Sequence, residues 1–267
     1  MPMQQGREFL FYPGCTLSTT AKRLGLCAKK SAEALGFALT ELEEWQCCGA
    51  VFPLAPDEVA PKLSSVRALV AARDKGLPLV VLCSACFHVL KLTNHQAKTE
   101  KDFASVIKNY DSELEYGGEA TVLHFLEVLR DVVGFENLKS KVTKPLSCHR
   151  LGAYYGCMLL RPSEAMGFDD AENPSIFEDF IRALGAEAIV YPYRNECCGG
   201  YKVPEKSAEL SKEVMDSSAN RGADSLVTAC PLCEFNLSKH GSVYYFTELL
   251  AKALGVERCY TTDGKFL

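Results

Sequence analysis

The hydrophobic pattern of this chain alternates between short apolar runs and longer stretches with apolar residues at helical spacing. The runs are typical of buried strands, and the stretches of amphipathic helices. The predicted strands are residues 8–12, 79–82, 188–191 and 225–228, and the predicted helices are residues 19–35, 61–75 and 174–184. Because strands that alternate with helices form parallel sheets covered by those helices, the pattern predicts an α/β protein.

Helix ends are marked by particular residues. Asn173 and Pro174 predict an N-cap followed by a first-turn proline, whereas Gly36 and Gly185 stand where helices commonly end. The polar stretch 91–120 predicts a helix followed by a loop insertion.

The chain also repeats itself, because four landmarks recur in the same order. The pairs are FYPGC (11–15) with YYGC (154–157), WQCCGA (45–50) with NECCGG (195–200), CSAC (83–86) with CPLC (230–233), and VLHFLEVL (122–129) with VYYFTELL (243–250). The last pair predicts a similar amphipathic helix at the end of each half. We therefore expect two pseudo-symmetric Rossmann-like halves, residues 1–140 and 141–267, each with a parallel sheet.

Composition narrows the functional classes. With 267 residues, 48% of them hydrophobic, the chain is long enough for two cores. A formal net charge of −5 with scattered basic residues argues against nucleic acid as a partner. Neither a signal peptide nor a membrane-spanning segment is predicted, so a cytoplasmic protein is expected. Thirteen cysteines in such a chain indicate reduced thiols with a metal or redox role.

Ten of these cysteines follow one pattern in both halves: a single cysteine, an adjacent pair, and a CxxC. They are Cys15, Cys47, Cys48, Cys83 and Cys86, and then Cys157, Cys197, Cys198, Cys230 and Cys233. Because the carboxyl ends of parallel strands open on one edge of a sheet, each set is expected to converge on one metal site. Glycines beside the cysteines permit close approach of the backbone to a bulky group.

Five thiols exceed the four ligands of a structural zinc, whereas neighbouring cysteines suit the several irons of an iron–sulfur cluster. Zinc in one half is the main alternative. Buried cysteines without metal, and structural disulfides, are two others.

These motifs resemble the cysteine-rich CCG domain proteins, specifically the B-type subunit of heterodisulfide reductase. The resemblance covers nearly the whole chain. It is densest in YYGCMLLRP from Tyr154, FDDAENP from Phe168, ALGAEAIVYPYRNECCGG from Ala183 and ACPLCEFNL from Ala229. Tyr155 and Met158 depart from it, since archaeal relatives often carry histidines at these positions. The spacings between the CCG motifs and their CxxC motifs are also slightly shorter than is usual in that family, especially in the second half.

The resemblance implies that each set of five cysteines holds a non-cubane 4Fe-4S cluster, in which two smaller units are bridged by cysteine sulfur. It further implies a cleft where a small disulfide is split, each sulfur meeting one cluster. Electrons would come from a ferredoxin-like iron–sulfur subunit, with a flavin-containing subunit behind it. The sequence itself has neither a flavin fingerprint nor a ferredoxin CxxCxxCxxxCP run.

Two other functions stay open. One is the CCG subunit of a respiratory succinate or fumarate reductase, or of a lactate or glycolate oxidase complex. The other is a non-catalytic electron-transfer or scaffold subunit. Without a membrane segment, contact with quinone would need a surface helix or a partner.

Several further residues are candidates for supporting roles. His88 follows a CxxC and could bond to cluster sulfur or to substrate, and His124 and Tyr245 occupy equivalent positions in the repeat. Arg161 could bind an anionic substrate group or serve a helix start. Three cysteines lie outside the pattern: Cys148 is read as a strand cysteine or a ligand, Cys27 as part of the core, and Cys259 has no counterpart.

Overall fold

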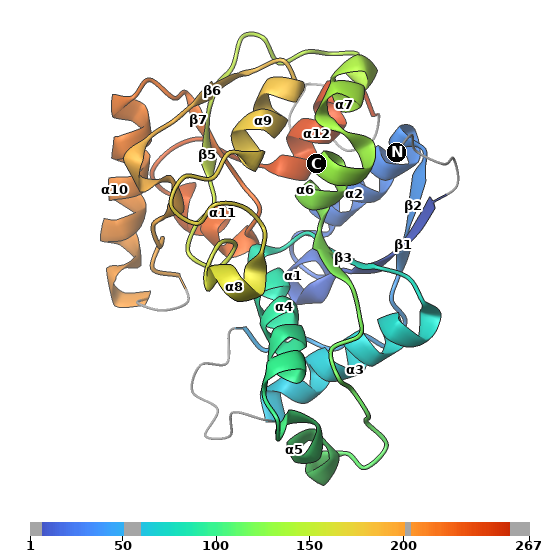
Figure 1. Cartoon of the computed structure of the whole chain (residues 1–267). Helices are drawn as coiled ribbons and strands as arrows, with labels where there is room; N and C mark the ends of the chain where they lie inside the picture. Colours follow the sequence, from blue (N-terminus) through green and yellow to red (C-terminus); the bar gives the residue numbers. More distant parts are fainter. Residues whose placement is uncertain (1–6, 51–59, 201–203, 257–267) are drawn as a thin grey trace.

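The computed structural model describes residues 7–50, 60–200 and 204–256 and contains two parallel sheets of four strands each (Figure 1). The first sheet has the order β2-β1-β3-β4 and the second β6-β5-β7-β8, so the second half repeats the topology of the first. The strands are β1 (Arg7–Tyr12), β2 (Phe37–Glu41), β3 (Leu79–Val81), β4 (Val122–His124), β5 (Arg150–Tyr154), β6 (Glu187–Ile189), β7 (Ser225–Thr228) and β8 (Val243–Tyr245). The α/β class and the two parallel sheets predicted from the sequence are thereby confirmed.

The helices follow the strands along the chain. In the first half they are α1 (Gly14–Ser18), α2 (Lys22–Leu35), α3 (Ala60–Lys75), α4 (Ser84–Thr99), α5 (Phe103–Tyr110), α6 (Phe125–Glu127), the π-helix η1 (Val128–Val133) and α7 (Phe135–Lys141). In the second half they are α8 (Ser163–Met166), α9 (Ile176–Ala183), the 3-10 helices η2 (Pro192–Asn195) and η3 (Pro204–Lys206), α10 (Ser207–Asn220), α11 (Pro231–Leu237) and α12 (Phe246–Leu254). The predicted boundary at residue 140 falls within α7 and stays a prediction.

Central strands are buried on both faces, which explains why they read as continuous apolar runs. Every residue of β3 and β7 is buried, and both strands lie in the interior of their sheets. In the first sheet Leu10 pairs with Leu79, and in the second Leu151 pairs with Ser225. The carboxyl ends of β3 and β7, which precede the CxxC motifs, are therefore buried and paired within their sheets.

The fourth landmark of each half is a strand followed by a helix, which corrects the prediction of a single amphipathic helix. Val122–His124 and Val243–Tyr245 form β4 and β8, and the chain then turns directly into α6 and α12. Capping boxes mark the transition: the backbone N–H of His124 donates to Glu127, and that of Tyr245 to Glu248. No turn residue separates each three-residue strand from the helix that follows. The strand therefore could not be distinguished from the helix by the spacing of apolar residues in the sequence.

The predicted helix 174–184 begins two residues later, at Ile176. A carboxylate outside the predicted segment causes this: Asp169 Oδ2 accepts hydrogen bonds from the backbone N–H groups of Ser175 (2.7 Å) and Ile176 (2.8 Å). Asn173 is not the cap, because its Oδ1 accepts from Arg194 instead. Gly36 and Gly185 do end their helices, with φ of 91° and 83°.

Two other predicted segments are divided in the structure. Residues 19–35 contain α2 only from Lys22, because the short helix α1 precedes it. In the stretch 91–120, α4 reaches Thr99 and is followed by the helix α5 before the chain reaches β4. The polar insertion is therefore more helical than predicted.

The largest core cluster draws on both halves, and helices of the two halves pack against each other. Helix α12 of the second half lies against α2 of the first, seen as red beside blue in Figure 1, and α4 lies beside α8. Aromatic rings from both halves meet there: His124 and Phe125 pack on Phe246, which also contacts Phe177. In the described part of the chain, no helix is long and apolar enough to cross a membrane.

Candidate metal centre

The single cysteine of each half comes directly after the first strand of its sheet. Cys15 lies in α1 after β1, and Cys157 follows β5, each behind a glycine with positive φ. A side chain at Gly14 would place its Cβ 2.8 Å from Cys86 Sγ, well inside van der Waals contact. The glycine therefore lets the first strand end against the CxxC cysteine.

The adjacent pairs lie in the loops after the second strand of each sheet. Cys48 Sγ is 3.4 Å from Cys86 Sγ, and in the second half Cys198 Sγ is 3.5 Å from Cys233 Sγ. Each pair thus meets the CxxC of its own half.

The CxxC motifs stand at the start of α4 and α11. Cys83 and Cys230 are the N-cap residues, and Cys86 and Cys233 lie in the first turn. Both helices begin at the carboxyl ends of central strands, β3 and β7. Sheet topology therefore places all three motifs of a half at one edge of its sheet.

The two cysteine sets adjoin each other across the boundary between the halves. The backbone N–H of Ser84 donates to the carbonyl of Ala229 at 2.8 Å, and its hydroxyl donates to the same oxygen at 3.1 Å. Cys83 and Cys230 lie next to these contacts, and a hydrogen bond with Cys230 is the main cause that lowers the pKa of Cys83. The second set, together with Ser84, Tyr155 and Met158, lines a narrow cavity at this junction.

Because the thiols of each set lie close together, their hydrogen bonds lower the pKa of some thiols and raise the pKa of others. Hydrogen bonds from Cys47 and Cys86 lower the pKa of Cys48 to about 3, and a hydrogen bond from Cys233 lowers that of Cys198. The corresponding bond with Cys198 raises the pKa of Cys233. Because adjacent buried thiolates repel one another, the sets can be fully ionised only around a group that carries positive charge.

The donor set fits an iron–sulfur cluster better than a single ion. Among the described residues, no group of three or more His, Cys, Asp or Glu side chains converges closely enough to hold one metal ion. In each half, one sulfur of the adjacent pair instead lies within 3.5 Å of a CxxC sulfur. Such a spacing suits several irons, with thiolates as their ligands.

Two tyrosines that sequence reasoning missed hold the paired-cysteine loops. Tyr12 Oη donates to the carbonyl of Gln46 at 2.5 Å, and Tyr154 Oη to that of Glu196 at 2.7 Å. These carbonyls immediately precede the cysteine pairs. A tyrosine three residues before the single cysteine of both halves was the available signal.

The candidate histidines and Tyr245 bond to the backbone around the site. His88 Nδ1 lies 3.0 Å from the carbonyl of Met158, so it links α4 to the segment after Cys157. His124 Nε2 lies 2.9 Å from the carbonyl of Leu82, while its Nδ1 accepts from the backbone N–H of Leu126. Tyr245 Oη donates to the carbonyls of Leu82 and Ala229. These two carbonyls precede the two CxxC motifs.

Arg161 bonds within the second half. Its guanidinium donates to the carbonyls of Asn195 and Ala171 and to the Glu172 carboxylate. These bonds connect Arg161 to the loop before Cys197 rather than to a helix start, and a role toward substrate stays a prediction. Tyr155, one of the departures from the resemblance, is buried and donates to Glu178 at 2.5 Å.

Two of the three remaining cysteines, Cys27 and Cys148, are described and lie apart from the two sets. Cys27 is buried on α2 against Ala251 of α12, as its core assignment predicted. Cys148 is exposed and precedes β5 rather than lying in it, because that strand begins at Arg150. Cys259 lies outside the described residues.

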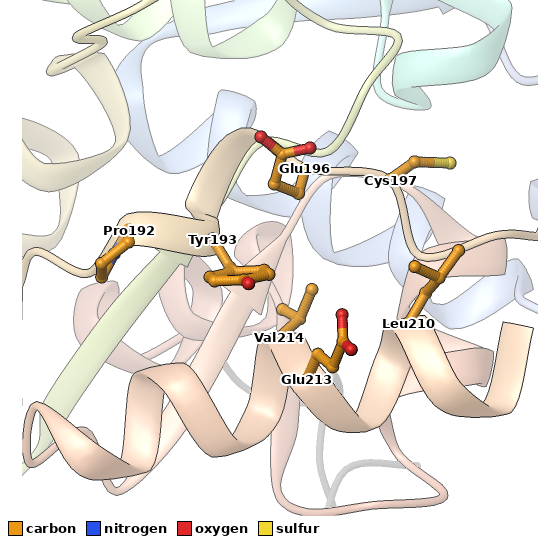
Figure 2. Close-up of a pocket in the computed structure, with 7 residues that line it drawn as sticks. All are labelled: Pro192, Tyr193, Glu196, Cys197, Leu210, Glu213 and Val214. Carbon is orange, nitrogen blue, oxygen red and sulfur yellow. The ribbon is translucent and has the colours of Figure 1, made fainter.

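An open pocket of about 480 Å³ lies beside the second set (Figure 2). It runs between η2 and α10, and its lining is Pro192, Tyr193, Glu196, Cys197, Leu210, Glu213 and Val214. Tyr193 is 41% exposed although it is aromatic. In Figure 2 the carboxylate of Glu213 rises from α10 between Tyr193 and Leu210, so this surface combines an aromatic ring with negative charge.

Comparisons with known proteins agree with this arrangement. The family model for the cysteine-rich domain (CCG) matches residues 9–91 and again 151–238. The 8-methylmenaquinol:fumarate reductase membrane anchor subunit of Wolinella succinogenes is 35% identical, over 94% of this chain and 93% of that protein. The B-type subunit of the ferredoxin/F420H2-dependent CoB-CoM heterodisulfide reductase of Methanosarcina acetivorans is 27% identical, over 91% of this chain and 88% of that protein.

A crystal structure of a hypothetical protein from Helicobacter pylori has the same fold. It superimposes with a TM-score of 0.70 at 12% identity and covers 96% of this chain and 51% of that one. The repeated cysteine motifs, the duplicated parallel sheets and the two family matches agree with one another. The chain belongs to the cysteine-rich CCG domain family, in the duplicated form that the B-type subunit of heterodisulfide reductase also has.

Proposed function

We propose that this chain is the iron–sulfur subunit of a multi-subunit oxidoreductase that cleaves or forms a disulfide. The single observation that carries the proposal is the adjacency of two equivalent cysteine sets, whose CxxC motifs meet through the hydrogen bonds of Ser84 to the carbonyl of Ala229. Two one-electron centres side by side match a reaction that transfers two electrons. The balanced change is RSSR′ + 2e⁻ + 2H⁺ to RSH and R′SH, with a reduced ferredoxin-like protein as the electron donor.

Each set would hold one 4Fe-4S cluster, of the non-cubane type that the resemblance implies. When bound, each cluster would supply or accept one electron. The chain itself would supply the ligands and shield the clusters from water. Each set has three buried cysteines, namely the two of the CxxC motif and Cys48 or Cys198. The other two, the single cysteine and Cys47 or Cys197, are partly exposed. The buried cysteines of each set are therefore shielded from water, and the partly exposed cysteines lie on the side that a partner can approach.

Electron supply from another protein is supported by the pocket beside Cys197. Its exposed ring at Tyr193 and the carboxylate of Glu213 suit a partner with a basic, partly apolar surface. A ferredoxin-like iron–sulfur subunit, with a flavin-containing subunit behind it, is the expected partnership, and the complex would lie in the cytoplasm. The substrate would be a small disulfide or the corresponding thiols.

Metal analysis tests the cluster assignment. Anaerobically purified protein should contain about eight irons and eight acid-labile sulfides per chain, as expected for two 4Fe-4S clusters. Cys198→Ser should lose about half of both, whereas Cys148→Ser, an exposed cysteine outside the sets, should lose none. Zinc with little iron would overturn the assignment.

A second function is favoured by the relative from Wolinella succinogenes, which is more similar in sequence than the Methanosarcina protein. In this case the chain would be the CCG subunit of a fumarate or succinate reductase complex and would relay electrons at a membrane surface. Reduced protein separates the two functions. Oxidation of both clusters by a small disulfide supports the first, whereas oxidation by a menaquinone analogue alone supports the second.

A further inference from the structure

The repeat duplicates the cysteines, but one side chain that contacts a cysteine sulfur occurs only in the second half. Asn236 Nδ2 lies 3.9 Å from Cys198 Sγ, and both residues are buried, with exposed fractions of 5% and 3%. Asn236 stands three residues after Cys233. The equivalent position, three residues after Cys86, is Val89, which has no polar group.

A lysine fixes the direction of this amide. Lys239 Nζ lies 3.4 Å from Asn236 Oδ1. Because an ammonium group only donates hydrogen bonds, the oxygen of the amide must face Lys239, and the NH₂ group then faces Cys198. Asn236 therefore donates a hydrogen bond to the sulfur.

A glycine makes room for the amide. A Cβ on Gly200 would lie 2.6 Å from Asn236 Nδ2, so even alanine would displace it. The counterpart of Gly200 in the first half is Ala50, just as Val89 is the counterpart of Asn236. The two positions therefore differ together between the halves: glycine with asparagine in one, and alanine with valine in the other.

The backbone donors do not create this difference, because they are present in both halves. The N–H of Gly49 donates to Cys47, as that of Gly199 does to Cys197 at 3.3 Å. The N–H groups of Ala50 and Gly200 serve Cys48 and Cys198 in the same way. At the adjacent cysteine pairs the side-chain asymmetry lies in the Asn236 amide. At the single cysteines it lies in Thr16, whose Oγ1 is 3.8 Å from Cys15 Sγ and whose counterpart in the second half is Met158.

We propose that Asn236 is a positioning residue that gives the second cysteine set a higher reduction potential than the first. A hydrogen bond to a ligand sulfur withdraws electron density and stabilises the more negative, reduced state. The Cys157 set would then be the first of the two to be reduced. This inference rests on the proposed function, since it requires a cluster in each half.

An EPR-monitored redox titration tests the inference. The wild type should show two midpoint potentials, and Cys198→Ser should remove the signal with the higher one. Asn236→Leu, which keeps the side-chain volume, should lower the higher potential and leave the lower one and the iron content unchanged. Ser238→Ala, on the turn after the same helix, is the matched control and should shift neither.

Two further variants keep the test decisive if Asn236→Leu fails to fold. Gly200→Ala should lower the same potential by displacing the amide. The double variant Val89→Asn with Ala50→Gly should raise the lower potential by building the second-half pair into the first half. Equal potentials in the wild type, or unchanged potentials in these variants, would overturn the inference. Absence of iron–sulfur signals altogether would instead overturn the proposed function.

Discussion

The hydroxyl of Tyr245 lies 2.8 Å from the carbonyl oxygen of Leu82, which belongs to the other half of the chain. The same hydroxyl reaches the carbonyl of Ala229 at 3.1 Å. Because Cys83 and Cys230 follow these carbonyls, one buried side chain ties together the starts of both CxxC motifs. Its counterpart in the repeat, His124, also bonds to Leu82, so the junction is asymmetric.

Tyr245→Phe should lower the stability of the junction. Both carbonyls keep another donor, so we expect the loss of about 0.5–1.5 kcal/mol typical of one hydrogen bond. Circular dichroism should show this as a Tm lower by roughly 1–6 °C. Tyr244→Phe, the adjacent and less buried tyrosine, is the control. An equal Tm change in both variants would contradict a special role for Tyr245.

Acid should destabilise the protein through His124. Burial lowers the pKa of His124 to about 3, below its ordinary value of 6.5. Between these values the unfolded chain binds the proton and the folded protein does not, so stability falls as the pH drops below 6.5. At pH 5 the loss relative to pH 7.5 amounts to about 2 kcal/mol.

Thermal unfolding of wild type and His124→Gln at both pH values measures this contribution. The variant is expected to be less stable at pH 7.5 but to lose less stability on acidification. His240→Gln, an exposed histidine, is the control and should follow the wild type. An identical pH dependence in His124→Gln and wild type would show that His124 is protonated in the folded protein.

Arg194→Met should strongly destabilise the segment before Cys197. Arg194 Nη1 pairs with Glu178 Oε1 at 2.5 Å, and both side chains are more than 90% buried. Removal of the guanidinium leaves a buried carboxylate without its cation, at a cost of about 3–5 kcal/mol.

The exposed pair of Arg182 and Asp179, on the helix that carries Glu178, supplies the control. Arg182→Met should cost less than about 1 kcal/mol, because surface ion pairs contribute little. Urea unfolding compares the two variants. Similar losses in both would mean that burial does not determine the strength of the Arg194 pair.

Glu213→Arg should weaken electron transfer from the electron-donating partner. The charge reversal lies in the pocket beside Cys197 and should repel a basic docking surface. Stopped-flow reduction by the partner should slow by about tenfold at low salt, whereas reduction by dithionite should not change. Glu209→Arg, an exposed glutamate on the same helix outside the pocket, is the control. Equal slowing in both variants would place docking elsewhere.

Sequence patterns were sufficient to predict the duplication and the fold class, and they singled out ten cysteines as the candidate site. Strand and helix periods differ enough to show the alternation, and ten cysteines in repeated spacing stand out against the rest of the chain. Gly36 and Gly185 were also sufficient to predict where two helices end. A left-handed residue at a helix end depends mainly on the glycine itself.

The residues that surround and position the cysteines could be identified only from the three-dimensional fold. The start of α9 depends on Asp169, and the positions of the cysteine pairs depend on Tyr12 and Tyr154. The contact between the halves depends on the Ser84 and Ala229 backbone. These bonds join residues that are distant in the chain, so no local period encodes them. The fold alone determines which donor reaches which sulfur, and Asn236 reaches Cys198 only because the packing brings α11 against the loop at Gly200.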